Sequence, residues 1–161
     1  FLVGDALLHH CGINGLNDPT VLSFGGQRSV LSHGDLLCLD DVDYQRFRVQ
    51  ARSAEWQERF LAQPLAQRRA QARGIRQESE ARKQSGAPYA DVDTPAAIAW
   101  LHTAQATTLI HGHTHRPAEH ALAPGLRRVV LSDWDAAAHP PRADVLRLSA
   151  AGLERIAIVP M

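Results

Sequence analysis

Three histidines occupy alternate positions in the segment TTLIHGHTHRP, residues 107–117: His111, His113 and His115. Gly112 separates the first two and lets the chain leave an extended conformation directly after an apolar run. Side chains two residues apart point to the same side of an extended backbone, so His113 and His115 can direct two ring nitrogens toward one metal ion or across two. Because imidazole is a frequent ligand of zinc, manganese and iron, the segment indicates a metal site.

A further histidine stands in a comparable position, since His33-Gly34-Asp35 follows a short stretch, Ser29–Ser32, that reads as a strand. Alone, SHGD is equally a turn in which Asp35 caps a helix. Together with the later histidine motif, SHGD indicates part of a functional site, because α/β sheets bind ligands at the C-terminal ends of their strands. The pairing favours one site built from His33, His113 and His115.

The elements that must position these residues follow from local patterns. Gly25-Gly26 between apolar runs predicts a hairpin within residues 21–35. A helix with Thr94 as its N-cap and Pro95 at its first helical position leads into a strand at residues 107–111. Further apolar stretches at 126–134 and 143–160, the second turning near Ala151-Gly152, complete a set of strands mixed with helices, which predicts an α/β layered domain.

Residues 40–87 differ from the rest because they carry no strand pattern. Asp40 and Asp41 are suitable N-caps, Pro64 interrupts the helical periodicity, and a second helix is predicted from about Leu65 to Arg82. Between residues 46 and 83 stand ten Lys or Arg residues against four Glu, a local charge of about +6.

The chain as a whole, at 161 residues, has a formal net charge of zero, which gives no basic signature of a nucleic-acid binder. Its two cysteines, Cys11 and Cys38, form no CxxC pair and fit a reducing compartment. We expect no nucleic-acid partner and no obligate protein partner, and neither a secretory signal nor a membrane-spanning run is visible.

The motifs SHGD and GHTHRP together resemble the calcineurin-like metallophosphoesterase superfamily. Within it, HGDLLCLDDVDYQRFR (33–48), LIHGHTHRPAEH (109–120), FLVG (1–4) and VLSDW (130–134) are similar to the bacterial UDP-2,3-diacylglucosamine diphosphatases of lipid A synthesis. The resemblance implies an α/β fold with a metallophosphoesterase-type β-sandwich flanked by helices, formed here by residues 1–39 and 90–161. Residues 40–89 would be an inserted helical cap.

The resemblance also implies the chemistry. Family members use two divalent metal ions, commonly Mn²⁺, to hydrolyse UDP-2,3-diacylglucosamine to UMP and 2,3-diacylglucosamine 1-phosphate. His33, His113 and His115 match catalytic metal ligands of the family, and His113 is expected to contact the substrate as well. His111 matches no ligand and is expected to be structural or to support the ligands.

Three further positions are expected to contact the substrate. Asp41 matches an acidic residue that contacts the sugar, Ser79 lies where the family has a substrate-contacting Ser, and Lys83 lies near the next contact. The loop SEARKQSG departs from the family pattern, because Gly86 stands where a Lys is expected. Either Lys83 replaces that residue or the loop has shifted.

The expected location is the cytoplasmic face of the bacterial inner membrane, as a peripheral protein. Arg68, Arg69, Arg73 and Arg76 would face anionic lipid headgroups, although a run of charge is equally an ordinary solvated helix face. The family motifs Asp-x-His, Gly-Asp and Gly-Asn-Arg-Asp precede the matched region, so the chain corresponds to the C-terminal two-thirds of a member. The 161 residues alone are therefore expected to be inactive. The alternatives are a truncated metal- or lipid-binding module and another calcineurin-like phosphoesterase.

Overall fold

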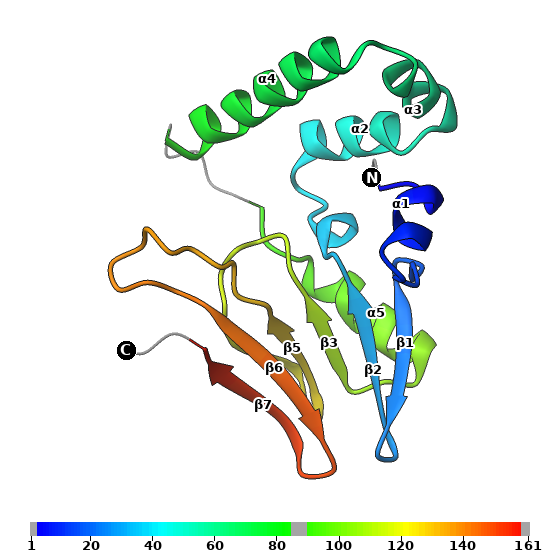
Figure 1. Cartoon of the computed structure of the whole chain (residues 1–161). Coiled ribbons are helices and arrows are strands. Elements are labelled where there is room, and N and C mark those ends of the chain that lie inside the picture. Colours follow the sequence, from blue (N-terminus) through cyan, green and yellow to red (C-terminus); the bar gives the residue numbers. More distant parts are fainter. Residues whose placement is uncertain (1–2, 85–89, 159–161) are drawn as a thin grey trace. The chain divides into compact units, whose positions relative to one another are not determined.

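The computed structural model describes residues 3–84 and 90–158 (Figure 1). The chain divides into two compact units. The helical unit comprises Phe1–Gly15 and Asp41–Ala90, and the sheet unit comprises Leu16–Asp40 and Asp91–Met161. The chain thus has a mixed α/β fold, while its division into a phosphoesterase core and a cap stays a prediction.

A five-stranded sheet with the order β1-β2-β3-β5-β4 forms the centre of the sheet unit. The predicted hairpin is confirmed: β1 (Thr20–Phe24) and β2 (Gln27–Ser32) pair antiparallel around two glycines with positive φ. Strand β3 (Thr108–His111) lies parallel to β2 on one side and parallel to β5 (Leu126–Val130) on the other. Strand β4 (Glu119–Ala123) closes the far edge antiparallel to β5.

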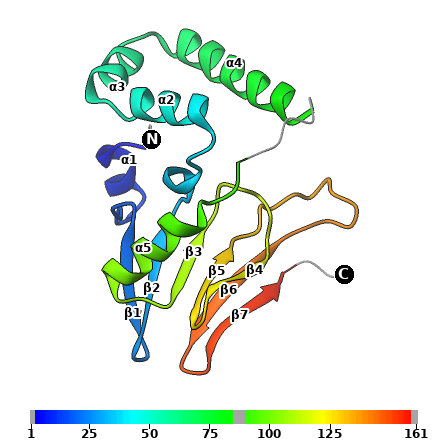
Figure 2. The same ribbon diagram turned by 180° about the vertical axis from the view of Figure 1, so that it is seen from behind.

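Helix α5 (Thr94–Ala104) packs against β2 and β3 and covers one face of the sheet (Figure 2). Leu101 of the helix and Leu109 and Val129 of the sheet are fully buried, so the core of the unit lies between these layers. The helix begins as expected from Pro95, but its cap is Asp93. The Asp93 carboxylate accepts the Ala96 N–H at 2.8 Å, an interaction that Asp makes at least as well as Thr.

A two-stranded sheet completes the unit, formed by β6 (Asp144–Ser149) and β7 (Gly152–Ala157). The turn lies where the sequence predicts it, and Gly152 adopts a φ of 118° that favours glycine. Arg155 ties the hairpin to the larger sheet, because its guanidinium donates to the carbonyl of Val130 at 2.6 Å.

The helical unit contains α1 (Asp5–His10), α2 (Val42–Ala51), α3 (Ala54–Leu61) and α4 (Leu65–Gln84). Helix α4 begins directly after Pro64, as predicted, and the helical run before it is split in two because Ser53 caps a new helix by accepting the Trp56 N–H. Among the helices within residues 3–84 and 90–158, none is long and apolar enough to cross a bilayer.

Three elements differ from the expectations. Helix α1 and strand β4 are not predicted by the sequence pattern, because the first is short and the second is an edge strand that mixes polar and small residues. The apolar stretch at 126–134 is a strand only as far as Val130. The β-sandwich implied by the family resemblance stays a prediction.

Candidate functional site

The parallel pairing of β2 and β3 brings two histidine-bearing loops together. Ser32, the last residue of β2, lies opposite His111, the last residue of β3, so His33 and Gly112 leave the sheet side by side. The Gly112 N–H donates to the His33 carbonyl at 3.1 Å and joins the two loops through their backbones. The rings of His33 and His113 then lie 5.0 Å apart, centroid to centroid. Sequence reasoning predicted this meeting of strand ends.

The first loop is held by a residue that the sequence analysis did not identify, Asp18. Its carboxylate accepts the Ser32 hydroxyl at 2.6 Å and the His33 backbone N–H at 3.3 Å. The Ser32 hydroxyl oxygen in turn accepts the Gly34 N–H at 3.0 Å. These three hydrogen bonds fix the backbone from which the His33 side chain projects.

The His33 ring is oriented by a carboxylate two residues later. Nδ1 of His33 lies 3.2 Å from Oδ1 of Asp35, which is only 1% exposed, whereas half of the His33 side chain is accessible. Asp35 opens a short 3-10 helix, Asp35–Leu37, and does not cap one. A ring whose Nδ1 faces a buried carboxylate presents Nε2 to the outside, the arrangement that metal-binding histidines commonly have.

The second loop has a different backbone from the one expected. His113 and His115 both have positive φ, 66° and 52°, in the left-handed region that non-glycine residues seldom adopt. The extended His-x-His geometry inferred from the sequence is therefore wrong. The turn at Gly112, closed by the Thr114 N–H donating to the Gly112 carbonyl at 2.8 Å, separates the two side chains. His113 lies against His33, while His115 takes another partner.

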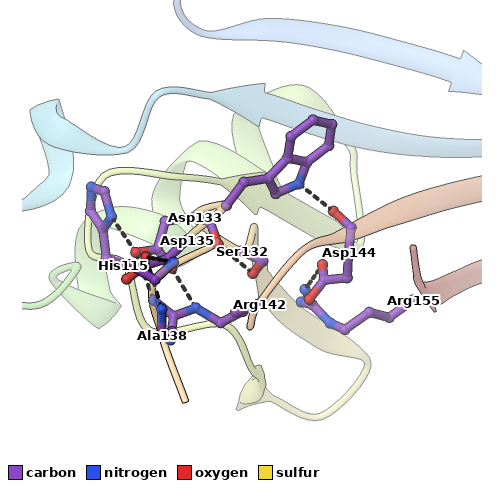
Figure 3. Close-up of polar contacts among 10 residues, drawn as sticks. His115, Ser132, Asp133, Asp135, Ala138, Arg142, Asp144 and Arg155 are labelled. Atoms are coloured by element: carbon purple, nitrogen blue, oxygen red, sulfur yellow. Dashed lines mark hydrogen bonds and ion pairs between the residues drawn. The ribbon is translucent and has the colours of Figure 1, made fainter. Parts of the chain in front are cut away.

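That partner is Asp133, in the segment that follows β5 (Figure 3). Nδ1 of His115 lies 3.2 Å from Oδ2 of Asp133. Arg142 donates to both oxygens of the same carboxylate, from Nε to Oδ1 at 2.8 Å and from Nη2 to Oδ2 at 2.9 Å. The hydrogen bonds from Arg142, supported by His115 and opposed by partial burial, lower the pKa of Asp133 below its ordinary value. Asp133 is therefore an anionic acceptor at neutral pH.

Beneath both loops lies a buried polar network around His111. This side chain is fully buried, its Nδ1 lies 2.9 Å from the Gly112 carbonyl, and its Nε2 lies 3.5 Å from Nη1 of Arg128. Because a carbonyl only accepts and a guanidinium only donates, these contacts fit a neutral ring protonated on Nδ1. Burial, with Arg128 adding to it, lowers the pKa of His111, although its bond to Gly112 acts in the opposite direction.

Arg128 also contacts Asp91, and its guanidinium donates two parallel hydrogen bonds of 2.6 and 2.7 Å to the Asp91 carboxylate. These bonds lower the pKa of Asp91 from 3.8 to about 2, despite the opposing effect of burial. The network connects β5, the end of β3 and the segment before α5. His111 is thus buried within a polar network, and its expected role as a residue that is not a ligand stays a prediction.

Donor chemistry provides a test of whether these side chains suit a metal ion. Within the described part of the chain, no group of three or more His, Cys, Asp or Glu side chains is arranged to hold a metal. The structure does contain a pair of adjacent imidazoles, His33 and His113, and a carboxylate on Nδ1 of both His33 and His115. Imidazole with carboxylate support suits a divalent transition metal, so the donor types fit while the set of ligands is partial.

The three expected substrate contacts belong to the helical unit. Asp41 is the N-cap of α2, where its carboxylate accepts the Tyr44 N–H at 3.1 Å, and it is 9% exposed. Ser79 and Lys83 lie on the backbone of α4, and their side chains fall outside the described residues. The substrate-binding role of all three stays a prediction.

The chain is similar to several known proteins that share one name. No family model matches the chain. The chain is 42% identical over 158 residues to the UDP-2,3-diacylglucosamine hydrolase of Chromobacterium violaceum, covering 97% of this chain and 65% of that protein. It is 41% identical over 159 residues to the protein of the same name from Bordetella pertussis, covering 96% of this chain and 62% of the relative.

A third relative, from Aromatoleum aromaticum and of the same name, is 44% identical over 138 residues, which is 83% of this chain and 56% of that protein. The chain thus spans rather less than two thirds of the length of the curated relatives that it matches. With identities of 41 to 44% across most of its length, the chain is similar to proteins named UDP-2,3-diacylglucosamine hydrolase.

Proposed function

We propose that the full-length protein containing this chain is a hydrolase that cleaves the diphosphate of UDP-2,3-diacylglucosamine, a step of lipid A biosynthesis. The products would be UMP and 2,3-diacylglucosamine 1-phosphate. The relatives are named as hydrolases of this compound. The observation that carries the proposal is the meeting of His33 and His113 at adjacent ends of two parallel strands.

His33, His113 and His115 would hold divalent cations, of which Mn²⁺ suits imidazole and carboxylate donors. When bound, two such cations neutralise phosphate charge and supply Lewis acidity. The protein's own part is orientation. Asp35 keeps Nδ1 of His33 turned inward at 3.2 Å, and Asp18 fixes the backbone at the same residue. Neutral imidazoles held in this way offer Nε2 without the cost of rotating the ring.

The ordered loops also suit a phosphate ester as the substrate. Catalysis of phosphoryl chemistry depends mainly on positioning and on stabilisation of charge. Asp41, Ser79 and Lys83 are the proposed contacts to the sugar and its substituents.

The same proposal places the protein at the cytoplasmic face of the inner membrane as a peripheral protein. Its substrate would carry two acyl chains, so access to a lipid surface is required. Arg69, Arg73 and Arg76 lie at intervals of four and three residues on α4, which puts them on one face of the helix, and all three are exposed. Near an anionic surface each contributes about 1 kcal/mol of attraction.

Turnover by the full-length protein tests the proposal. With Mn²⁺ and UDP-2,3-diacylglucosamine, the wild-type protein should release UMP, and His113→Ala should lose most of this activity. His102→Ala is the matched control, because His102 is an exposed histidine in the last turn of α5. UMP release that is equal in the wild-type and His113→Ala proteins would remove the proposed function.

A further inference from the structure

The segment between β5 and β6 is a closed loop with hydrogen bonds across its base. Asp135 and Arg142 form an antiparallel bridge, with backbone N–H to carbonyl distances of 2.8 and 2.9 Å. Within the loop, the Asp135 carboxylate accepts the backbone N–H groups of Ala137 and Ala138 at 2.9 and 3.1 Å. The position of the Arg142 side chain is therefore set by a defined backbone (Figure 3).

The Arg142 guanidinium donates two hydrogen bonds to the carboxylate of Asp133. This bidentate geometry fixes the plane of the carboxylate as well as its position. His115 then contacts Oδ2 of Asp133 through Nδ1. Figure 3 shows the order of the contacts, from Arg142 through Asp133 to His115. The loop between β5 and β6 thus orients a histidine that lies in the loop after β3.

The choice of ring nitrogen has a chemical consequence. A carboxylate that already accepts two hydrogen bonds from arginine can only accept from the imidazole, so Nδ1 of His115 carries the proton. In the neutral ring the lone pair is then on Nε2. A histidine on an unsupported loop instead exchanges between tautomers and rotates, and it presents that lone pair only part of the time.

We propose that Asp133, clamped by Arg142, is a positioning residue that holds His115 in the Nδ1–H tautomer with Nε2 turned toward a divalent cation. The proposal rests on the proposed function in one respect, the role of His115 as a ligand. It adds two residues to the site, and it gives a physical role to the VLSDW segment, which begins with the last residue of β5 and carries Asp133. Loss of such a supporting carboxylate typically weakens metal binding by about 10- to 100-fold.

Two measurements on the full-length protein test the proposal, with Asp133→Ala as the variant. Long-range ¹H–¹⁵N spectra of the metal-free protein report the tautomer of each histidine, with the His115 signals assigned by their loss in His115→Gln. Titration with Mn²⁺ followed by electron paramagnetic resonance reports affinity. The matched control is Asp144→Ala, since Asp144 also pairs with an arginine, Arg155 at 2.6 Å, but is not paired with a histidine in the described contacts.

In the wild-type protein and in Asp144→Ala we expect the Nδ1–H tautomer at His115. In Asp133→Ala we expect a shift to the Nε2–H form and a Mn²⁺ affinity lower by about 10- to 100-fold. Asp133→Glu should restore part of the wild-type tautomer signal. If Asp133→Ala does not fold, Arg142→Gln replaces it, and a mixture of tautomers at His115 is then the expected result.

The outcomes separate the two proposals. An unchanged His115 tautomer in a folded Asp133→Ala protein would overturn the positioning role whatever the function of the protein. A shifted tautomer with wild-type Mn²⁺ affinity, in Asp133→Ala and in His115→Ala alike, would support control of the ring by Asp133 but would remove His115 from the metal site. That second result contradicts the proposed function and the part of this proposal that rests on it.

Discussion

His33 and His113 lie with their ring centroids 5.0 Å apart because the strands that precede them pair in parallel. The contact depends on strand pairing and on the hydrogen bond from the Gly112 N–H to the His33 carbonyl, so it is a property of the fold.

Gly34, next to His33, leaves no room for a side chain. A Cβ added there would lie 2.8 Å from Nδ1 of His111, and Gly34 has a φ of 99°. Gly34→Ala should therefore lower the free energy of unfolding by about 2 to 4 kcal/mol, through backbone strain and overpacking together. Gly26→Ala is the matched control, because Gly26 has a φ of 77° with open space around it, and it should cost only about 1 to 2 kcal/mol. Equal losses in urea denaturation would show that the contact with His111 is unimportant.

The ion pair between Asp91 and Arg128 should stabilise the fold in a way that depends on pH and is lost in acid. The pKa of Asp91 falls from 3.8 to about 2 on folding, so the unfolded chain binds the proton more readily. The stabilisation is then complete above about pH 4 and is lost as the pH falls toward 2. Asp91→Asn should lower stability at pH 6 and should show a shallower decline between pH 4 and 2. Stability curves that run parallel in wild type and variant over this interval would contradict the assignment.

The cationic face of α4 predicts binding to anionic membranes. Flotation of the full-length protein with phosphatidylglycerol vesicles should decrease as salt rises, because the attraction is screened. The triple change Arg69→Gln, Arg73→Gln and Arg76→Gln should weaken binding on the order of 100-fold, at about 1 kcal/mol for each arginine. A control of equal charge is Arg46→Gln, Arg59→Gln and Arg147→Gln, since each of these residues already has an acidic partner. Equal losses in the two triple variants would argue against a specific face.

The parts of the site that the sequence predicts are those that depend on local pattern. The glycine pair at 25–26, the apolar run before His111 and the glycine at 112 mark where strands turn and end. Two histidines after two such strands were enough to infer their meeting, because parallel strands align their C-terminal ends.

The remaining parts depend on contacts between distant segments. Asp91 and Arg128 are 37 positions apart, and Asp18 reaches His33 from the loop before β1. No periodicity links such residues, and any Asp or Arg on a loop reads as solvated in sequence. The left-handed backbone at His113 and His115 was also missed, because non-glycine residues adopt it only where the surrounding contacts require it.

The ranking of the three histidines in the segment LIHGHTH tests the central claim most directly. Turnover and bound Mn²⁺ should be measured in the full-length protein for His111→Ala, His113→Ala and His115→Ala, with circular dichroism to verify folding. We predict that the His113 and His115 variants each lose metal and at least about 100-fold in turnover, because a displaced ligand misplaces the reacting groups. His111→Ala should keep its metal and stay within about 10-fold of wild type. Loss of metal in His111→Ala with retention in His113→Ala would contradict the account, and it would make His111 and His113 the ligand pair.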